Sequence, residues 1–393
     1  MSLATLTHRA SLPCPQVTPE QAAHLLERHY GMTGKLRSLG SQQDLNYRVD
    51  STRGRFVLKI CRGDYAAVEL QAQHAALNSL STHPGLRVPK VIPTVEGEDL
   101  LTVNVDGQTL HLRLLDYIDG QPLTHLPHLS RTVIEGFGEL CGQMSLALAG
   151  FEHPGLARTL QWDPRHAQAL IAHLLATLPD LPQRAALEQV ARQVEAHVQP
   201  LAAHLPWQAV HMDITDDNVV WQRDAQRHWR IQGVIDFGDL VHTWRIADLS
   251  VTCAALLHHA DGDPFALLPA IQACHAVTPL QREELEVLWP LIVARAAVLV
   301  LSSEQQQCLD PDNVYLKKNA EHEWEIFHIA TSVPFELMQA AILRSVGKTL
   351  PPVANQDFAP LLPGLVGREF ALIDLGVLSP HFEAGNWETP GID

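Results

Sequence analysis

The hydrophobic pattern changes its period near residue 118, and this change limits the possible folds more than any other feature. Before it, runs of alternating apolar and polar residues predict strands: LNYRVD and RFVLKI around the turn STRG (45–60), and TLHLRLLDYI (109–118). Two segments at helical spacing, 17–30 and 66–80, lie among them. Residues 1–118 are therefore expected to form a mostly antiparallel sheet that carries a helix.

Beyond residue 118 the apolar spacing becomes helical. The helices expected there are residues 131–149, 164–177, 185–198, 264–275, 281–303 and 321–344. Two short strand-like runs around the polar turn RDAQRH predict a hairpin within 219–235. The fold class is therefore α+β, with a helical region at 119–350. A proline-rich tail without clear period, 351–393, is expected to lie over that region or extend from it.

The charge balance limits the possible partners. The chain has 393 residues, with 28 Lys and Arg against 44 Asp and Glu, a net charge of −16. Nucleic acids and anionic membranes bind basic surfaces, so neither is an expected partner. The six cysteines lie far apart without a CxxC pair, which favours reduced thiols over a disulfide framework or a zinc site.

The most apolar stretch is residues 285–301, LEVLWPLIVARAAVLVL. Glu286, Pro290 and Arg295 interrupt it, and about 20 apolar residues are needed to span a bilayer. We expect a buried helix. The first residues lack the apolar core of a signal peptide, so a cytoplasmic protein is the expectation. The sequence does not predict the oligomeric state.

Two segments joined by the predicted hairpin carry the chemistry: HMDITDDNVV (211–220) and GVIDFGD (233–239). Phosphoryl transfer needs a carboxylate that accepts the proton of the attacking hydroxyl, and metal ions that bridge the phosphate oxygens. Asp213 can be that base. Because Mg²⁺ prefers oxygen ligands, Asn218 and Asp236 can bind it through an amide and a carboxylate oxygen. The hairpin folds the chain back so that these two ligands can face each other.

A lysine that holds the phosphates is expected from the first region. The strand FVLKI (56–60) alternates, so Val57 and Lys59 share one face. A lysine between apolar neighbours needs an anionic partner. We expect Glu69, on the following helix, to pair with Lys59, with Gln73 on the same helix face at i, i+4.

Each of these residues alone has a common structural explanation. A lone lysine such as Lys59 is more often a surface residue with a buried stem, and Asp236 alone can be a turn residue. The ordered combination favours the catalytic interpretation, because each motif also lies in the structural context it needs. Asp248 is interpreted as structural, capping or anchoring the helix that begins near it.

The remaining histidines are expected to be structural. In THLPH (124–128), Pro127 disfavours a helix, so we expect a loop rather than a metal site. His258 and His259 are neighbours in sequence and are expected on different faces of a helix.

The ordered set of motifs resembles the aminoglycoside phosphotransferase-like kinases, the small-molecule branch of the protein-kinase-like fold. The resemblance covers roughly residues 20–345 and implies a bilobal fold with a β-rich N-lobe and a mainly helical C-lobe. The segment SQQDLNY (41–47) resembles the family's nucleotide loop. This implies that the phosphates are covered by backbone amides near Ser41, Asp44 and Asn46.

The resemblance also implies a hinge strand at LLDYIDG (114–120), where the backbone around Asp116 and Ile118 would pair with a purine. One departure from the family is HMD in place of the usual HGD. Met212 has less backbone freedom than glycine, but its side chain can pack beneath the loop.

Within the family the sequence is most similar to the hydroxylysine kinase-like branch, through DLNY (44–47), the helix from Glu69 to Leu77, and GVIDFGD. This implies Mg²⁺, with ATP or GTP as co-substrate, and a small amino-bearing acceptor such as 5-hydroxy-L-lysine. Homoserine, choline or ethanolamine, and aminoglycosides are the alternatives. By position, Asp239, and less so Asp216 or Asp217, could meet a substrate ammonium group.

Two other functional classes share parts of the pattern. A protein kinase is disfavoured because the sequence has no GxGxxG and no APE after the DFG-like motif. A non-catalytic nucleotide-binding module is disfavoured because Lys59, Asp213, Asn218 and Asp236 are all present.

Overall fold

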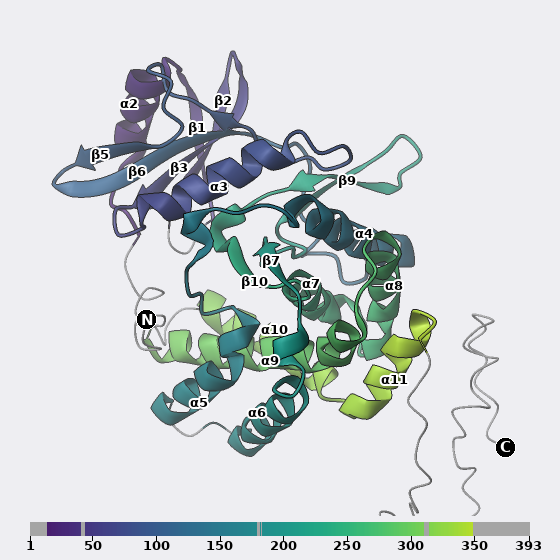
Figure 1. The fold of residues 1–393 in the computed structure, drawn as a ribbon. Coiled ribbons are helices and arrows are strands. Elements are labelled where there is room, and N and C mark those ends of the chain that lie inside the picture. Colours follow the sequence, from purple (N-terminus) through teal and green to yellow (C-terminus); the bar gives the residue numbers. More distant parts are fainter. Residues whose placement is uncertain (1–13, 41–43, 179–180, 182, 310–313, 349–393) are drawn as a thin grey trace, which may run out of the picture. The chain divides into compact units, whose positions relative to one another are not determined.

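The strands predicted before residue 118 form one antiparallel sheet (Figure 1). The structure is a computed structural model, which describes residues 14–40, 44–178, 181, 183–309 and 314–348. The predicted nucleotide-loop residue Ser41 and the tail 351–393 lie outside the described residues. The strands are β1 (Gly34–Leu39), β2 (Leu45–Ser51), β3 (Gly54–Arg62), β4 (Val91–Ile92), β5 (Leu101–Val105) and β6 (Gln108–Asp116). They are ordered β1-β2-β3-β6-β4, and β5 also pairs with β6.

Helix α2 (Pro19–Tyr30) covers one face of this sheet and begins and ends where the sequence predicts. Thr18 forms a capping box with Gln21, and Gly31 ends the helix in the left-handed conformation, with φ of 57°. Leu26 packs in one apolar cluster with Leu58 and with the other sheet residues whose side chains point to the same face as Leu58. Because side chains alternate along a strand, the residues between these apolar ones point to the other face of the sheet.

That other face carries the polar residues and helix α3 (Ala67–Leu80). Lys59 of β3 and Arg113 of β6 are register partners, and both side chains are buried. Gln73 of α3 accepts a hydrogen bond from Arg113 at 2.5 Å. The sheet thus divides an apolar face under α2 from a charged face under α3.

The helical part follows the predicted pattern. Its helices are α4 (Arg131–Leu148), α5 (Ala167–Thr177), α6 (Arg184–Val198), α7 (Ala247–Leu256), α8 (Leu268–Val277), α9 (Arg282–Leu309), α10 (Val314–Ala330) and α11 (Phe335–Ser345). The predicted boundary at Ile118 falls between β6 and α4. By length and composition α9 could cross a membrane, but 83% of its apolar window is buried among α5, α6, α7, α10 and α11. The apolar stretch is therefore a core helix, as the sequence predicts.

The predicted helix 321–344 is wrong as a single element. The structure has two helices there, α10 and α11, separated by residues 331–334. Pro334 is the N-cap of α11. Proline has no backbone N–H and disfavours helical geometry at the residue before it, so the helix cannot continue through this point.

The predicted hairpin is confirmed as β8 (Val219–Arg223) paired with β9 (Trp229–Val234). A second two-stranded sheet was not predicted: β7 (Trp207–Val210) pairs with β10 (Val241–Trp244). Each strand has four residues, too few to show an alternation in the sequence. The two small sheets position the segments predicted to carry the chemistry. The loop between β7 and β8 lies next to the loop between β9 and β10, because the Ile235 N–H donates to the Asn218 carbonyl oxygen.

Candidate active site

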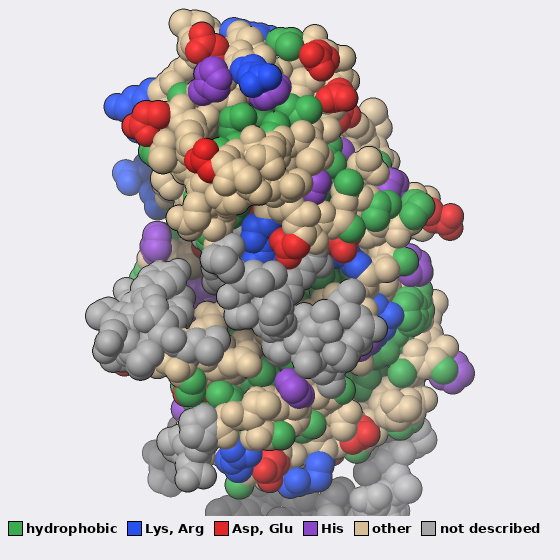
Figure 2. Space-filling view, turned by 90° about the vertical axis from the view of Figure 1, so that its left-hand side faces the viewer, with side chains coloured by type: hydrophobic (Ala, Val, Ile, Leu, Met, Phe, Trp, Pro, Cys, Tyr) green, Lys and Arg blue, Asp and Glu red, His purple; other side chains and the backbone are tan. Residues whose placement is uncertain are grey.

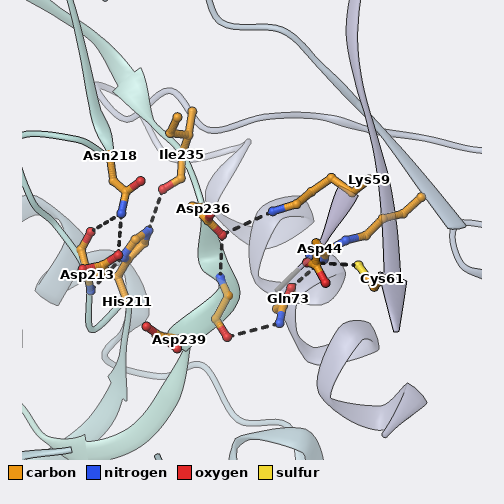
Figure 3. Close-up of polar contacts among 12 residues, drawn as sticks. Asp44, Lys59, Cys61, Gln73, His211, Asp213, Asn218, Ile235, Asp236 and Asp239 are labelled. Carbon is orange, nitrogen blue, oxygen red and sulfur yellow. Dashed lines mark hydrogen bonds and ion pairs between the residues drawn. The ribbon is translucent and has the colours of Figure 1, made fainter. Parts of the chain in front are cut away.

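The loop between β7 and β8 brings the predicted base and one predicted metal ligand together (Figure 3). Asn218 Nδ2 donates to Asp213 Oδ2 at 2.6 Å and to the Asp213 carbonyl oxygen at 3.1 Å. The Asn218 amide oxygen points away from this pair. The Asn218 backbone carbonyl accepts the N–H of Ile235 at 2.9 Å, which joins the two segments that the sequence predicts to be catalytic.

His211 fixes the shape of this loop. Its Nε2 lies 3.1 Å from the Ile235 carbonyl oxygen, so Nε2 carries the proton, and its Nδ1 accepts the N–H of Asp213 at 3.2 Å. Burial lowers the pKa of His211 to about 4. A neutral ring with one donor and one acceptor is the form these two bonds require.

Asp248, in the first turn of α7, anchors the same loop. Its carboxylate accepts the backbone N–H groups of His211 at 3.2 Å and of Met212 at 2.6 Å. Met212 has φ of 71°, and its side chain is fully buried with Val210 and Val241. The methionine thus packs beneath the loop, as expected. Asp248 therefore has the structural role that the sequence predicts, but it anchors the loop that contains Asp213 rather than only its own helix.

Asp236 faces the charged side of the sheet. It has φ of 59°, and its Oδ1 accepts the N–H of Gly238 at 3.2 Å. Lys59 Nζ lies 3.3 Å from the same oxygen. The ammonium group of Lys59 is the main reason why the pKa of Asp236 falls to about 2. The structure therefore joins the sheet and the helical part through the two residues assigned to phosphate and metal.

Further residues of the predicted nucleotide site surround Lys59. Asn46 is its register partner on β2. Asp44 accepts a hydrogen bond from the thiol of Cys61 at 3.4 Å, and burial raises the pKa of Asp44. Gln73 donates to the Gly238 carbonyl oxygen at 3.5 Å, so helix α3 contacts the turn formed by Asp236–Gly238, which we call the DFG-like turn (Figure 3).

The predicted pair of Lys59 with Glu69 needs correction. The ion pair that the structure gives Lys59 is with Asp236, whereas Glu69 lies 3.4 Å from Arg158. Arg158 Nη2 also lies 3.8 Å from Asp239. The cause is a competing cation: the buried Arg158 guanidinium lies between Glu69 and Asp239.

The predicted hinge residues lie at the end of β6. The N–H of Asp116 donates to the Lys90 carbonyl oxygen at 2.9 Å, and the Asp116 carboxylate accepts the Lys90 N–H. Ile118 is buried. A Cβ at Gly233 would lie 2.6 Å from Ile118 Cδ1 and 2.7 Å from the Arg87 carbonyl oxygen, and because the backbone oxygen cannot move aside as a side-chain end can, this close approach of the hairpin favours glycine.

A second acidic side chain lies near the predicted base. Burial, together with the charge of Asp239, raises the pKa of Asp213 to about 7, and burial raises the pKa of Asp239 as well. Arg295 of α9 opposes both shifts. Its guanidinium carbon lies 4.5 Å from the centre of the Trp162 ring. Its buried Nη1 has no hydrogen-bond partner among the described residues.

Sequence reasoning missed three arginines of this site: Arg113, Arg158 and Arg295. Arg113 and Arg295 each interrupt an apolar run, and a charge at a buried position is a signal of function or pairing. Arg158 lies in an irregular segment and left no pattern. On the face drawn in Figure 2, the described Lys and Arg side chains are interspersed with Asp and Glu rather than gathered in one patch.

The donor set fits a hard divalent cation. Asp236 offers carboxylate oxygens, and Asn218 offers the amide oxygen that its bond to Asp213 leaves over. Oxygen ligands at a site with few protein donors are typical of Mg²⁺ bound together with phosphates. The residues present therefore match the metal that the chemistry needs.

Comparisons with known proteins define the class. The chain matches the phosphotransferase enzyme family (APH) over residues 35–285. It is 24% identical to a hydroxylysine kinase of Danio rerio over 313 residues, 76% of this chain and 87% of that protein. It is 28% identical to a homoserine kinase of Pseudomonas aeruginosa (strain UCBPP-PA14) over 277 residues, 67% of this chain and 79% of that one.

A solved structure shares the fold. The amicoumacin kinase determined with AMP-PNP and Ca²⁺ superposes with a TM-score of 0.58 at 16% identity, covering 84% of this chain and 94% of its own. The chain belongs to the phosphotransferase enzyme family and has its bilobal, protein-kinase-like α+β fold. It is a small-molecule kinase, a phosphotransferase with an alcohol group as acceptor.

Proposed function

We propose that this enzyme transfers the terminal phosphate of ATP or GTP, with Mg²⁺, to a hydroxyl group of 5-hydroxy-L-lysine. The arrangement of Asp213, Asn218 and Asp236 around one loop pair carries the proposal, because these are the parts that phosphoryl transfer needs. The hydroxylysine kinase relatives support the acceptor, and the nucleotide and metal in the amicoumacin kinase complex support the co-substrates.

The residues divide the work as follows. Asp213 accepts the proton of the attacking hydroxyl, and the bond from Asn218 holds its carboxylate in position. Asn218 and Asp236 bind Mg²⁺, which neutralises charge on the phosphate oxygens when bound. Lys59 holds the α- and β-phosphates.

The rest of the nucleotide is held from the N-terminal part. Backbone amides near Ser41, Asp44 and Asn46 cover the phosphates, and the hinge at Asp116 and Ile118 pairs with the base. Glu69 acts indirectly: it pairs with Arg158, which in turn donates to the Gly238 carbonyl oxygen of the DFG-like turn.

Arg295 supports an acceptor with a carboxylate. A buried guanidinium nitrogen without a hydrogen-bond partner loses free energy unless a ligand supplies an acceptor. Arginine is well suited to carboxylates, because its planar group binds both oxygens. Hydroxylysine and homoserine have this group, and choline, ethanolamine and aminoglycosides lack it. Asp239, whose charge acts on Asp213, meets the substrate ammonium.

Homoserine is the second candidate, because the homoserine kinase relatives match at 28% identity and the acceptor shares the carboxylate. The choice is tested by measuring nucleotide consumption with hydroxylysine, homoserine, choline, ethanolamine and kanamycin. We expect the fastest turnover with hydroxylysine. If none is phosphorylated and Mg-nucleotide does not raise the melting temperature, the proposal is wrong.

The role of Arg295 has a sharper test. Homoserine and 3-aminopropanol differ by the carboxylate alone. With Arg295→Met we expect KM for the amino acid to rise at least tenfold and KM for the amino alcohol to stay within twofold. An equal change for both compounds would show that Arg295 only balances the charges of Asp213 and Asp239.

A further inference from the structure

Two histidines converge on one carboxylate beside the catalytic loop. His258 and His259 were expected on different faces of a helix, and this expectation is wrong. They lie in the 3-10 helix Leu257–His259 after α7, with ring centroids 3.5 Å apart. His258 Nε2 lies 3.5 Å from Asp216 Oδ2, and His259 Nε2 lies 3.2 Å from the same oxygen. Asp216 and His259 are both only 4% exposed.

The protons on these rings are fixed by their other nitrogens. His258 Nδ1 lies 2.7 Å from the Ala255 carbonyl oxygen, and His259 Nδ1 lies 2.7 Å from the Leu126 carbonyl oxygen. A carbonyl oxygen only accepts, so both Nδ1 atoms carry hydrogen. In a neutral imidazole the lone pair is then on Nε2, the atom that faces Asp216.

The result is three electron-pair donors facing one another. His258 Nε2 is buried without a geometrically acceptable hydrogen-bond partner in the described part of the chain. One proton shared between His259 and Asp216 would satisfy His259 but leave His258 unsatisfied. A cation satisfies all three groups at once.

The two nitrogen–oxygen separations match those of a tetrahedral transition-metal site. Zinc binds imidazole nitrogen at about 2.0–2.1 Å and carboxylate oxygen at about 2.0–2.2 Å, so ligand atoms on a tetrahedral site are about 3.3–3.5 Å apart. The two nitrogen–oxygen separations are 3.5 and 3.2 Å, and all three ligand atoms lie within 4.8 Å of one another. Carbonyl oxygens behind both rings are the outer partners that metal-binding histidines usually have.

We propose that Asp216, His258 and His259 form a second metal site, which binds a divalent ion of the zinc class and is separate from the Mg²⁺ site. Water or His322 completes the coordination. The His322 ring from α10 meets the His258 ring edge to face, with centroids 4.4 Å apart. Imidazole ligands favour Zn²⁺ over Mg²⁺, which prefers oxygen.

The position gives the ion a role in ordering the catalytic loop. Asp216 lies between the base Asp213 and the metal ligand Asn218. Its carbonyl oxygen accepts the N–H of Leu123 at 3.1 Å. An ion at this site would join the catalytic loop to the end of α7. We expect it to stabilise that loop without taking part in the reaction.

The test uses the full chain stripped with a chelator. Zn²⁺ is added and the protein is dialysed before metal analysis, with excess Mg-ADP present to occupy the oxygen ligands. We expect one Zn²⁺ per chain and a higher melting temperature. Replacement by Co²⁺ should give the intense visible absorption of tetrahedral cobalt, which Zn²⁺ then removes.

Variants assign the site. His258→Gln, the less buried of the two histidines, should weaken Zn²⁺ binding at least tenfold and abolish the cobalt band. His125→Gln, an exposed histidine of the same neighbourhood, is the matched control and should leave both unchanged, as should Asp236→Asn. The proposal is overturned if the wild type retains no Zn²⁺, or if His258→Gln and Asp216→Asn retain it. It is also overturned if nitrogen NMR of the metal-treated wild type shows a proton on His259 Nε2, since the pair is then an ion pair.

Discussion

At position 212 we expect the glycine variant to be more stable than the alanine variant, which is the reverse of the usual order. Met212 combines a left-handed φ of 71° with a fully buried side chain. Met144 is also fully buried, but lies within the helix α4. Truncating either side chain to alanine removes similar apolar contacts, at a cost of about 2–5 kcal/mol in the free energy of unfolding. The two sites differ in what a further change to glycine does.

At Met212, glycine relieves a left-handed conformation that costs other residues about 1–2 kcal/mol. Glycine also lowers the free energy of unfolding by about 0.4–1 kcal/mol relative to alanine, because it gives the unfolded chain more conformational freedom. Met212→Gly should therefore be more stable than Met212→Ala by roughly 0.5–1 kcal/mol, the balance of those terms. At Met144 the order reverses, because glycine is about 1 kcal/mol worse than alanine inside a helix.

Urea unfolding of the four variants measures both differences, since the free energy falls linearly with urea concentration. The predicted gap between the two sites is about 1.5–2 kcal/mol. The reasoning fails if Met212→Ala equals or exceeds Met212→Gly in stability while the Met144 pair behaves as expected. All four variants should be less stable than the wild type, although Met212→Gly gives the loop the glycine usual in the family.

Three further outcomes test the site. Asp213→Asn should lower kcat by about 10²–10⁴-fold and leave Mg-nucleotide binding intact by thermal shift; retained turnover would refute its role as base. Lys59→Met should raise KM for nucleotide more than KM for the acceptor, and an equal rise in both would contradict a phosphate contact. Burial raises the pKa of Asp248 to about 6, so its contribution to folding stability, present at low pH, is lost as pH rises from about 4 through 6. Asp248→Asn should remove that pH dependence and cost about 1–3 kcal/mol at pH 7, because the two backbone N–H groups bond to different carboxylate oxygens and the amide replaces one oxygen with an NH₂ donor. Urea unfolding at pH 4 to 7 checks both expectations.

Much of the fold follows from local pattern. The alternation of β3 and β6 predicts both strands, and the caps Thr18 and Gly31 give the limits of α2. Elements without a long pattern were missed, such as the four-residue strands β7 and β10. The prediction of a single helix over 321–344 extended through Pro334, because the apolar residues have helical spacing on both sides of the break between α10 and α11.

In the candidate site, too, the contacts within one local segment could be predicted from the sequence, and those between distant segments could not. Asp213 and Asn218 lie five residues apart, so their pairing depends on one short loop that the sequence encodes. The partner of Lys59 depends on which carboxylates and arginines meet when the sheet packs on the helical part. Glu69 was the nearest choice in the sequence, but Arg158, 89 residues away, lies against it in the structure.

The sequence by itself determined the class of chemistry, because the residue types and the order of the lysine, the HxDxxxxN segment and the DFG-like turn belong to local elements. Only the tertiary structure decided which charges neutralise one another. It places Arg295 beside Asp213 and brings His258 and His259 to Asp216. Pairing energies depend on distances of a few ångströms between residues that are remote in the chain, and a linear pattern does not contain those distances.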